Sequence, residues 1–370
     1  MRKNRKAFTL VELMAASAIM AIIVLGVLSV TSNILKTYTR ATTQLQNFFD
    51  ANVVGNILME DLESIEIKRD GRAWLQVSYP KDVGMLTGRT YTSNAPIRPP
   101  EIMFYAKTSL RPKYTKENTV FTTGEQMQQS VMIPGSLCAI KYQIALKSPF
   151  LKSQGDGGND ENQYNAFYGF YRAVIDSRST ILENMGRDKQ GYVSNPEDES
   201  YRNALYANVW QGTSSVIDER GEEVSGVPLE TWSRSPENLL ASNVVDMRVT
   251  FAVMYKNKHN HDDENAPKYR VAYIPPGIPF TVGPRILTDE AYEITSTGER
   301  VNVDTSSEEF RGGNLTFADI SVTFISEAGA REMRALMRGK NMTQEHFKRI
   351  VLQHGNTVVR RVRFMSEPLH

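Results

Sequence analysis

The chain has 370 residues, with 43 Lys and Arg against 42 Asp and Glu, so its formal net charge is +1. This near balance gives no sign of a nucleic-acid partner, which a strongly basic chain would indicate. The only cysteine, Cys138, cannot form a disulfide within the chain, so a packed core must hold the fold together.

The first predicted element is a long apolar helix close to the N-terminus. Four basic residues precede it: Arg2, Lys3, Arg5 and Lys6. No charged residue occurs from Leu13 to Leu35, a run that reaches roughly 34 Å as a helix and can cross a bilayer core. Because the basic residues gather before this run, the sequence predicts a single-pass membrane anchor with a cytoplasmic N-terminus and the rest of the chain outside the cytoplasm.

Glu12 is the most informative residue of this segment. A carboxylate in a membrane-spanning helix costs about 2.5–3.5 kcal/mol at mid-bilayer and less near the interface. A chain that needed only an anchor would have no reason to keep it. The carboxylate therefore indicates that this segment does more than anchor the chain.

The stretch Lys6-Ala7-Phe8-Thr9-Leu10-Val11-Glu12-Leu13 resembles the class III signal of type IV pilins and pseudopilins. The resemblance implies that a prepilin peptidase and methylase removes residues 1–7 as a leader, cuts between Ala7 and Phe8, and methylates the new amine. It also implies that Glu12 meets the methylated amine of a neighbouring pilin-like subunit during assembly. Ala7 stands where the family usually has glycine. Loss of the leader leaves a formal net charge of −3.

Other interpretations of the same segment remain open. Ala16-Ser17-Ala18 has the small residues of a secretory cleavage site, although the apolar run continues well past it. A plain anchor would carry a periplasmic binding protein, or an enzyme with its site in long loops. A chain of either kind would keep Met1, whereas a pilin-like chain would lose its leader.

Helical periodicity continues beyond the apolar run. Apolar residues recur every three or four positions: Ile34, Tyr38, Ala41, Leu45, Phe48, Ile57, Leu58, Leu62 and Ile65. We expect one helix from Phe8 to about Glu66, with residues 8–35 in the membrane and residues 36–66 exported and packed on a globular head. Gly55 is the position at which we expect a bend. A coiled coil with a partner helix is the alternative.

Residues 72–370 are expected to form an α+β head, with a mainly antiparallel sheet, additional helices and long loops. The expected early strands are Trp74–Tyr79, Glu101–Lys107, Leu137–Lys147 and Tyr164–Ile175. The expected loops are Pro80–Pro100, Ser153–Asn162, Asn184–Glu199 and Asp218–Ser235.

Later in the chain, alternation with a period of two predicts half-buried strands around 245–251 and 320–324. Ser326 and Thr343 are suited to cap two amphipathic helices that end at glycines 339 and 355. A final strand contains Val362 and Phe364, with two arginines facing solvent: Arg361 and Arg363.

The segments 239–249 and 318–324 resemble the paired late strands of J-type minor pseudopilins, with Phe317-Ala318 in place of the usual proline. The length and the Ala7-Phe8 start also resemble the pilin-like Verru_Chthon cassette protein C family. The second resemblance adds a family label and no known activity. The long loops and the J-type resemblance favour a minor subunit, initiating or tip-proximal, of a type II secretion or type IV pilus-like filament. Such a subunit is held in the inner membrane until it is extracted, and its head is periplasmic.

Candidate chemistry is sparse. The weak metal candidates are His259, His261, Asp262 and Asp263, in a run that we interpret as a hairpin tip between strands ending near Lys256 and beginning near Tyr269. The run 155–161 resembles the calcium loops of some major pseudopilins but lacks EF-hand spacing, and we expect a loop. No common catalytic motif occurs, and we expect surface or capping roles for His346, His354 and His370. We therefore expect no enzyme activity, cofactor or metal.

Overall fold

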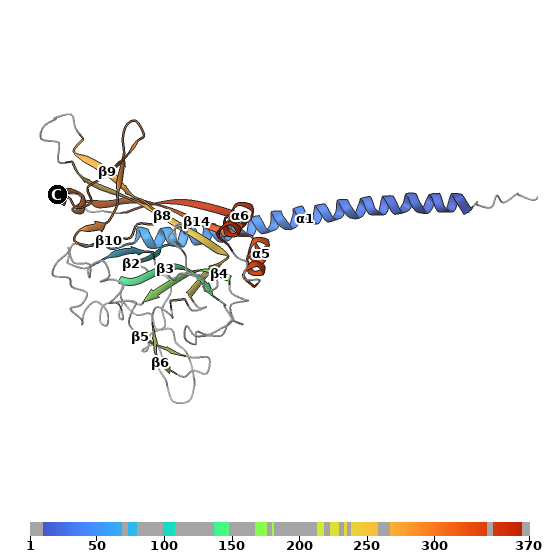
Figure 1. Ribbon diagram of the computed structural model, residues 1–370. Coiled ribbons are helices and arrows are strands. Elements are labelled where there is room, and N and C mark those ends of the chain that lie inside the picture. The colour runs from blue at the N-terminus through green and yellow to red at the C-terminus, as the bar shows by residue number, and fades with distance from the viewer. Residues whose placement is uncertain are drawn as a thin grey trace, which may run out of the picture. The chain divides into compact units, whose positions relative to one another are not determined.

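The structure is a computed structural model that describes residues 10–68, 73–79, 99–107, 137–147, 167–175, 180, 213–217, 223–228, 233–234, 238–257, 267–338 and 343–364. The chain forms two units, Met1–Phe49 and Asp50–His370. The first helix, α1 (Leu10–Glu63), contributes to both (Figure 1). The remaining described elements are short helices and antiparallel strands, so the predicted α+β class is confirmed.

The predicted long N-terminal helix is confirmed within three residues at its C-terminal end. The helix continues through Gly55 without a break. No proline occurs before Pro80, so no residue of this stretch lacks the backbone N–H that a continuous helix needs. After Glu63 the chain turns, and Ile65 forms an isolated antiparallel bridge with Ala106. That bridge places the end of α1 beside the second strand.

The larger sheet has seven strands in the order β11-β10-β1-β2-β3-β4-β7, and every neighbouring pair is antiparallel. Its strands are β1 (Leu75–Ser78), β2 (Glu101–Lys107), β3 (Leu137–Lys147), β4 (Phe167–Ile175), β7 (Leu239–Ser242), β10 (Phe280–Val282) and β11 (Ile286–Thr288). The four early strands were predicted from the sequence and are confirmed. In β2 six consecutive residues are buried, so this sheet is covered on both faces there, which explains its unbroken apolar run.

The second sheet has six strands in the order β13-β12-β9-β8-β14-β15. Its strands are β8 (Val244–Lys256), β9 (Tyr269–Ile274), β12 (Tyr292–Ile294), β13 (Arg300–Asn302), β14 (Asn314–Ile325) and β15 (Gly355–Arg363). Val245, Met247, Val249 and Phe251 are buried, as their alternation predicts. The predicted hairpin is also confirmed, because Lys256 of β8 pairs with Tyr269 of β9.

A two-stranded sheet corrects one expected loop. β5 (Thr213–Ile217) pairs with β6 (Glu223–Pro228), and β6 lies inside the expected loop Asp218–Ser235. Gly226 and Pro228 have weak strand propensity, so the pattern concealed a strand that pairing with β5 supports. The other expected loops, apart from residues 99–100, lie outside the described residues.

Three further helices are described: α4 (Glu308–Arg311), α5 (Glu327–Arg338) and α6 (Gln344–His354). Ser326 Oγ accepts a hydrogen bond from the Gly329 amide at 3.3 Å, and Thr343 Oγ1 accepts one from the His346 amide at 3.2 Å. Both predicted caps are therefore confirmed. Gly329 lets the two longer helices approach closely, since a Cβ there would lie 2.6 Å from the His354 Cβ.

In the second unit, the end of α1 lies between the two large sheets, as Figure 1 shows for β2–β4 on one side and β8 and β14 on the other. Four of its side chains belong to the main core: Ala51, Val54, Leu58 and Leu62. Of the predicted stripe, Leu58 and Leu62 are confirmed in this core and Ile65 packs against it, whereas Ile57 is half-buried and Ala51 and Val54 were not predicted. Ile34 and Tyr38 are exposed, and the side chains of Leu45 and Phe48 lie outside the described residues.

Candidate functional site

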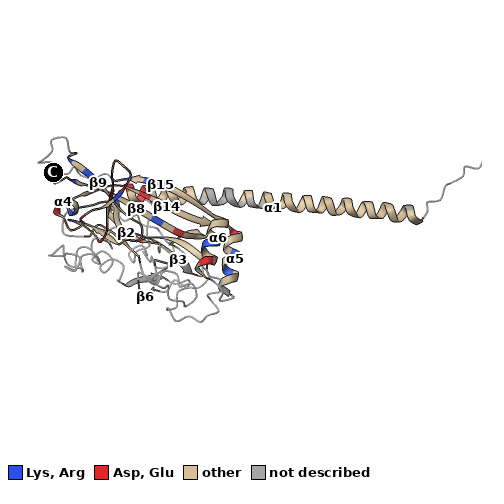
Figure 2. Cartoon of the chain, turned by 45° about the horizontal axis from the view of Figure 1, so that its top comes forward, with Lys and Arg blue, Asp and Glu red and all other residues tan. Residues whose placement is uncertain are grey.

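The N-terminal part of α1 is apolar, and its described side chains are exposed. The segment Leu13–Tyr38 has a mean hydropathy of 2.6 over its most apolar stretch, and none of that stretch is buried. The long tan stretch of α1 in Figure 2 shows the same composition. A helix that is apolar on all sides needs a lipid or protein environment. Its length and composition fit a membrane anchor.

The residues predicted to act in processing and assembly lie at the start of this helix. The leader, its basic residues and the predicted cleavage site between Ala7 and Phe8 lie outside the described residues. Glu12 lies in the first turn of α1, but its side chain is likewise outside the described residues. The cleavage site and the role of Glu12 therefore stay predictions.

The weak metal candidates are not brought together by any described contact. His259, His261, Asp262 and Asp263 fall outside the described residues, between β8 and β9. Within the described part of the chain, no group of three or more His, Cys, Asp or Glu side chains is arranged to hold a metal ion. His354 instead packs at the junction of α5 and α6, where its Nε2 lies 3.5 Å from Glu332 Oε2.

A buried polar cluster joins α1 to the seven-stranded sheet. Asp61 of α1 is 1% exposed and accepts hydrogen bonds from Arg172 of β4, at 2.6 Å from Nε and 2.8 Å from Nη2. The hydroxyl of Tyr142 on β3 donates to the same carboxylate. One carboxylate of the helix thus contacts two adjacent strands through a bidentate guanidinium and a phenol.

The surroundings of Tyr142 and Arg172 shift the pKa of each side chain upward. Burial and the negative charge of Asp61 raise the pKa of Tyr142 well above its ordinary value, so the phenol stays a donor. Burial alone would lower the pKa of Arg172, but its hydrogen bonds to Asp61 and the nearby Tyr142 raise it overall. The guanidinium therefore stays charged beside the protonated phenol.

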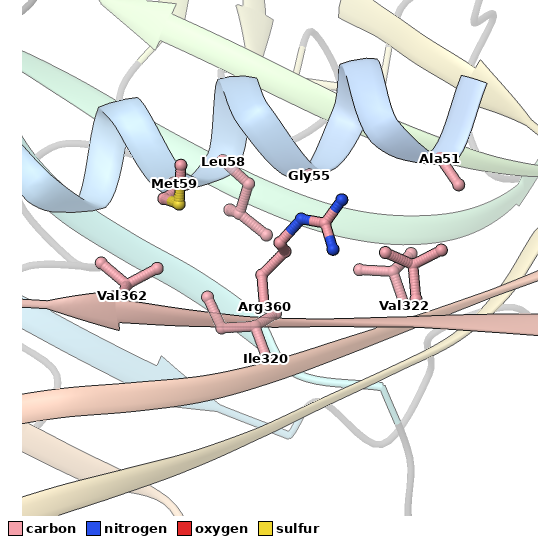
Figure 3. A pocket seen from close by; sticks show the side chains of 9 residues that line it. Ala51, Gly55, Leu58, Met59, Ile320, Val322, Arg360 and Val362 are labelled. Atoms are coloured by element: carbon pink, nitrogen blue, oxygen red, sulfur yellow. The ribbon is translucent and has the colours of Figure 1, made fainter. Parts of the chain in front are cut away.

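The other side of α1 meets the six-stranded sheet through Arg360. This side chain rises from β15 toward the helix, as Figure 3 shows, and its Nη2 donates to Asn52 Oδ1. Its aliphatic stem passes over Gly55, at 3.5 Å from where a Cβ would stand. A narrow apolar gap remains beside it, lined also by Leu58, Ile320 and Val362, with room for roughly one water molecule.

Two further ion pairs lie in the sheets, one buried and one with an exposed guanidinium. Lys141 Nζ of β3 lies 2.9 Å from Glu101 Oε2 of β2, and both side chains are nearly inaccessible. Tyr255 of β8 donates to Glu293, whose other oxygen lies 2.5 Å from the guanidinium of Arg270. Burial and then the Glu293 carboxylate raise the pKa of Tyr255. These pairs join neighbouring strands, which is a structural role.

Sequence reasoning missed the polar residues that fix α1 in the second unit. The sequence does contain a sign of this cluster. Arg172 lies on the same face of β4 as Phe170 and Val174, which are buried. A charged residue at an inward position of an apolar strand needs a buried partner. Asp61, beside the apolar Leu58 and Leu62, is the matching acid on the helix.

Comparison with known proteins yields one match. The family model described as the prokaryotic N-terminal methylation motif matches residues 2–28. No curated protein and no solved structure matches the chain. The motif and the apolar helix together support a type IV pilin-like class III signal, and the motif implies processing by a prepilin peptidase and pilin-type assembly.

Proposed function

We propose that this chain is a minor pilin-like (pseudopilin) subunit of a type II secretion or type IV pilus-like filament, with a structural and assembly role and no catalytic role. One observation carries the proposal. The methylation motif at residues 2–28 runs directly into an exposed apolar helix that is long enough to cross a membrane, Leu13–Tyr38. A secretory signal peptide would end well before such a length.

In this proposal the leader is cut between Ala7 and Phe8, and the head lies on the periplasmic side of the inner membrane. The excess of basic residues before the apolar run supports this orientation. The proposed partners are the prepilin peptidase and methylase and the neighbouring pilin-like subunits.

Glu12 is proposed to pair with the methylated amine of Phe8 on a neighbouring subunit. An uncompensated carboxylate in hydrocarbon is costly, and a cation partner removes much of that cost. The pairing therefore favours assembled chains over single anchored ones. It also sets the axial position of one helix against the next, because both charges lie close to the start of the mature helix.

A structural role is supported by the hydrogen bonds among the buried polar groups of the head. Asp61, Tyr142 and Arg172 satisfy one another inside the core. The described gap beside Arg360 has room for roughly one water molecule, too little for a substrate.

A minor role is supported by the long connections in the head. β1 and β2, β2 and β3, and β3 and β4 are antiparallel neighbours, which two to five residues could join. Here β1 ends at Ser78 and β2 begins only at Glu101. In the same way, β2 ends at Lys107 and β3 begins only at Leu137. Such insertions hinder the tight stacking of heads within the body of a filament. At the tip of a filament no further subunit stacks on the head, so the same insertions are tolerated. The resemblance of the late strands to J-type minor pseudopilins favours the same place.

Glu12→Ala tests the assembly role, with Ser17→Ala in the same apolar helix as the matched control. We expect Glu12→Ala to be inserted and cleaved normally but to be lost from sheared filaments, whereas Ser17→Ala is recovered like the wild type. Quantitative proteomics of the same filaments should find about one copy of the chain per filament. Equal recovery of both variants would overturn the role of Glu12, and a chain that dominates the filament mass would overturn the minor role.

A further inference from the structure

The free edges of the two large sheets differ greatly in length. The seven-stranded sheet ends in β11, with 3 residues, and β7, with 4 residues. The six-stranded sheet ends in β13, with 3 residues, and β15, with 9 residues. Proteins usually keep edge strands short or irregular, because a long regular edge is a template for another strand. β15 is the exception among these four edges.

On the side away from β14, the backbone of β15 presents a regular row of N–H and C=O groups that no described strand pairs with. β15 pairs with β14 over nine residues without a register shift (both are labelled in Figure 2). At its two ends the hydrogen bonds are Ser326 N to His354 O and Phe364 N to Thr316 O, so even-numbered residues bond to β14. In an antiparallel ladder the alternate residues then face away.

The outward residues are therefore Thr357, Val359, Arg361 and Arg363. Among the described residues, no strand pairs with this edge. One hydrogen bond reaches it, from the Arg360 guanidinium to Val359 O at 3.2 Å. The edge has the alternating donors and acceptors that a further antiparallel or parallel strand requires.

We propose that the edge of β15 accepts an extended acidic segment of another protein chain as an additional strand of the six-stranded sheet. The charge of the strand indicates the occupant. β15 contains three arginines and no acidic residue: Arg360, Arg361 and Arg363. Opposite charges on facing positions of two strands are favourable, and like charges are unfavourable.

The three arginines are not equally available. Arg360 is bound to Asn52 beneath the sheet, and Arg361 forms a bidentate pair with Asp319, both at 2.7 Å. Arg363 is exposed and has no ion pair with a described residue. Acidic side chains of the incoming strand would thus meet Arg363 first, at the C-terminal end of β15.

A second copy of the same strand fits less well. Two β15 strands side by side would bring six arginines into one ribbon, and among the described residues their ion-pair partners are the two Asp319 carboxylates. A polysaccharide would not use a row of peptide N–H and C=O groups repeated at strand spacing. An acidic polypeptide satisfies both the backbone row and the charge.

The inner side of the same edge offers apolar surface. Val358 and Val362 line the gap that remains next to Arg360. Figure 3 shows Val362 pointing toward α1. Strand addition usually combines backbone pairing with pockets for alternate side chains. An apolar side chain on the inner face of the incoming strand would cover this gap.

The test uses the full chain in its native cells, with the photo-crosslinking residue p-benzoylphenylalanine in place of Thr357. Val359→Pro removes an outward N–H and leaves the ladder to β14 intact, because proline is tolerated on that side of an edge strand. Val359→Thr is the matched control, since it keeps the N–H. We expect crosslinking in the control and its loss in Val359→Pro, with sequencing of the adduct showing a partner segment with acidic residues at alternate positions.

Charge variants make the test independent of the proline. We expect Arg363→Glu to lower the crosslinking yield about 3- to 10-fold, with Arg363→Lys close to wild type. The proposal is overturned by an adduct with a second copy of this chain, by the absence of any adduct, or by adducts that neither Val359→Pro nor Arg363→Glu reduces. None of these outcomes depends on filament formation, so the result is distinct from that for Glu12.

Discussion

Asp61 is the residue on which the position of α1 in the second unit depends most. It contacts Arg172 and Tyr142 on two neighbouring strands from within an otherwise apolar layer. Apolar contacts tolerate small shifts of a helix along its axis, whereas a bidentate ion pair does not. The cluster therefore defines the register of the helix against the sheet.

Asp61→Asn should lower the free energy of unfolding by about 3–5 kcal/mol, because it leaves the Arg172 guanidinium buried without its counter-charge. Denaturant titration of a soluble fragment that begins at Lys36 measures this. Glu60→Gln, on the exposed neighbour, is the control and should change stability by no more than about 0.5 kcal/mol. Similar losses in both variants would contradict the role of the cluster.

Tyr142 gives the fragment a distinct dependence on alkaline pH. Its pKa is raised by burial and by Asp61, so the folded state holds the phenolic proton after the unfolded state has released it. The stability from this group is complete below the unfolded pKa of about 10 and is lost as the pH rises from there toward the folded pKa, by up to about 1.4 kcal/mol per pH unit.

Tyr142→Phe should flatten that loss between about pH 10 and 11, even though its stability at pH 8 is lower. Tyr171, whose burial raises its pKa to about 12, remains in the variant and continues to titrate. Equal slopes for the variant and the wild type would show that Tyr142 is not the source.

At the scale of elements, the strands were predictable where burial imposed a simple pattern. β2 and β3 begin and end at the predicted residues, because apolar runs bounded by turn residues leave little choice. The short strands β10 to β13 were not predicted, because three residues carry too little pattern. β6 was assigned to a loop because its composition does not favour a strand, and its strand conformation depends on pairing with β5.

The candidate site was only partly predictable for a similar reason. The N-terminal motif is local in sequence, so the stretch Lys6–Leu13 could be identified directly, and it lies within the matched residues 2–28. The cluster of Asp61, Tyr142 and Arg172 joins positions 111 residues apart, and no local pattern states which buried charges meet. Each was visible as a polar residue in an apolar element, but the pairing required the fold.

The contact between α1 and the sheets can be tested with one substitution that should destabilise the fragment and one that should stabilise it. Leu58→Ala should destabilise the fragment by about 2–5 kcal/mol, since it removes a side chain that is 2% exposed in the main core. Gly55→Ala should stabilise it by about 0.5–1 kcal/mol, because a Cβ there makes an ordinary contact with Arg360 within a helix. Thermal unfolding of the two variants measures both shifts. An unchanged melting temperature for Leu58→Ala would mean that this side of the helix faces a partner instead.

At the scale of the whole molecule, the chain combines an apolar helical segment whose described side chains are exposed with a folded head that has its own core. The first part requires a membrane or other helices, and the second does not. The motif at residues 2–28 connects this division to pilin-type processing and assembly. The β15 edge adds a place at which the head could receive a partner.

The N-terminus of the native protein tests the central claim most directly. Mass spectrometry of the intact protein and of its N-terminal peptide should find a chain that begins at Phe8 with a methylated amine, in wild-type cells. In cells without the prepilin peptidase, the same chain should keep its leader. A native chain that retains Met1, or one that is cut near Ala18, would contradict the assignment as a pilin-like subunit.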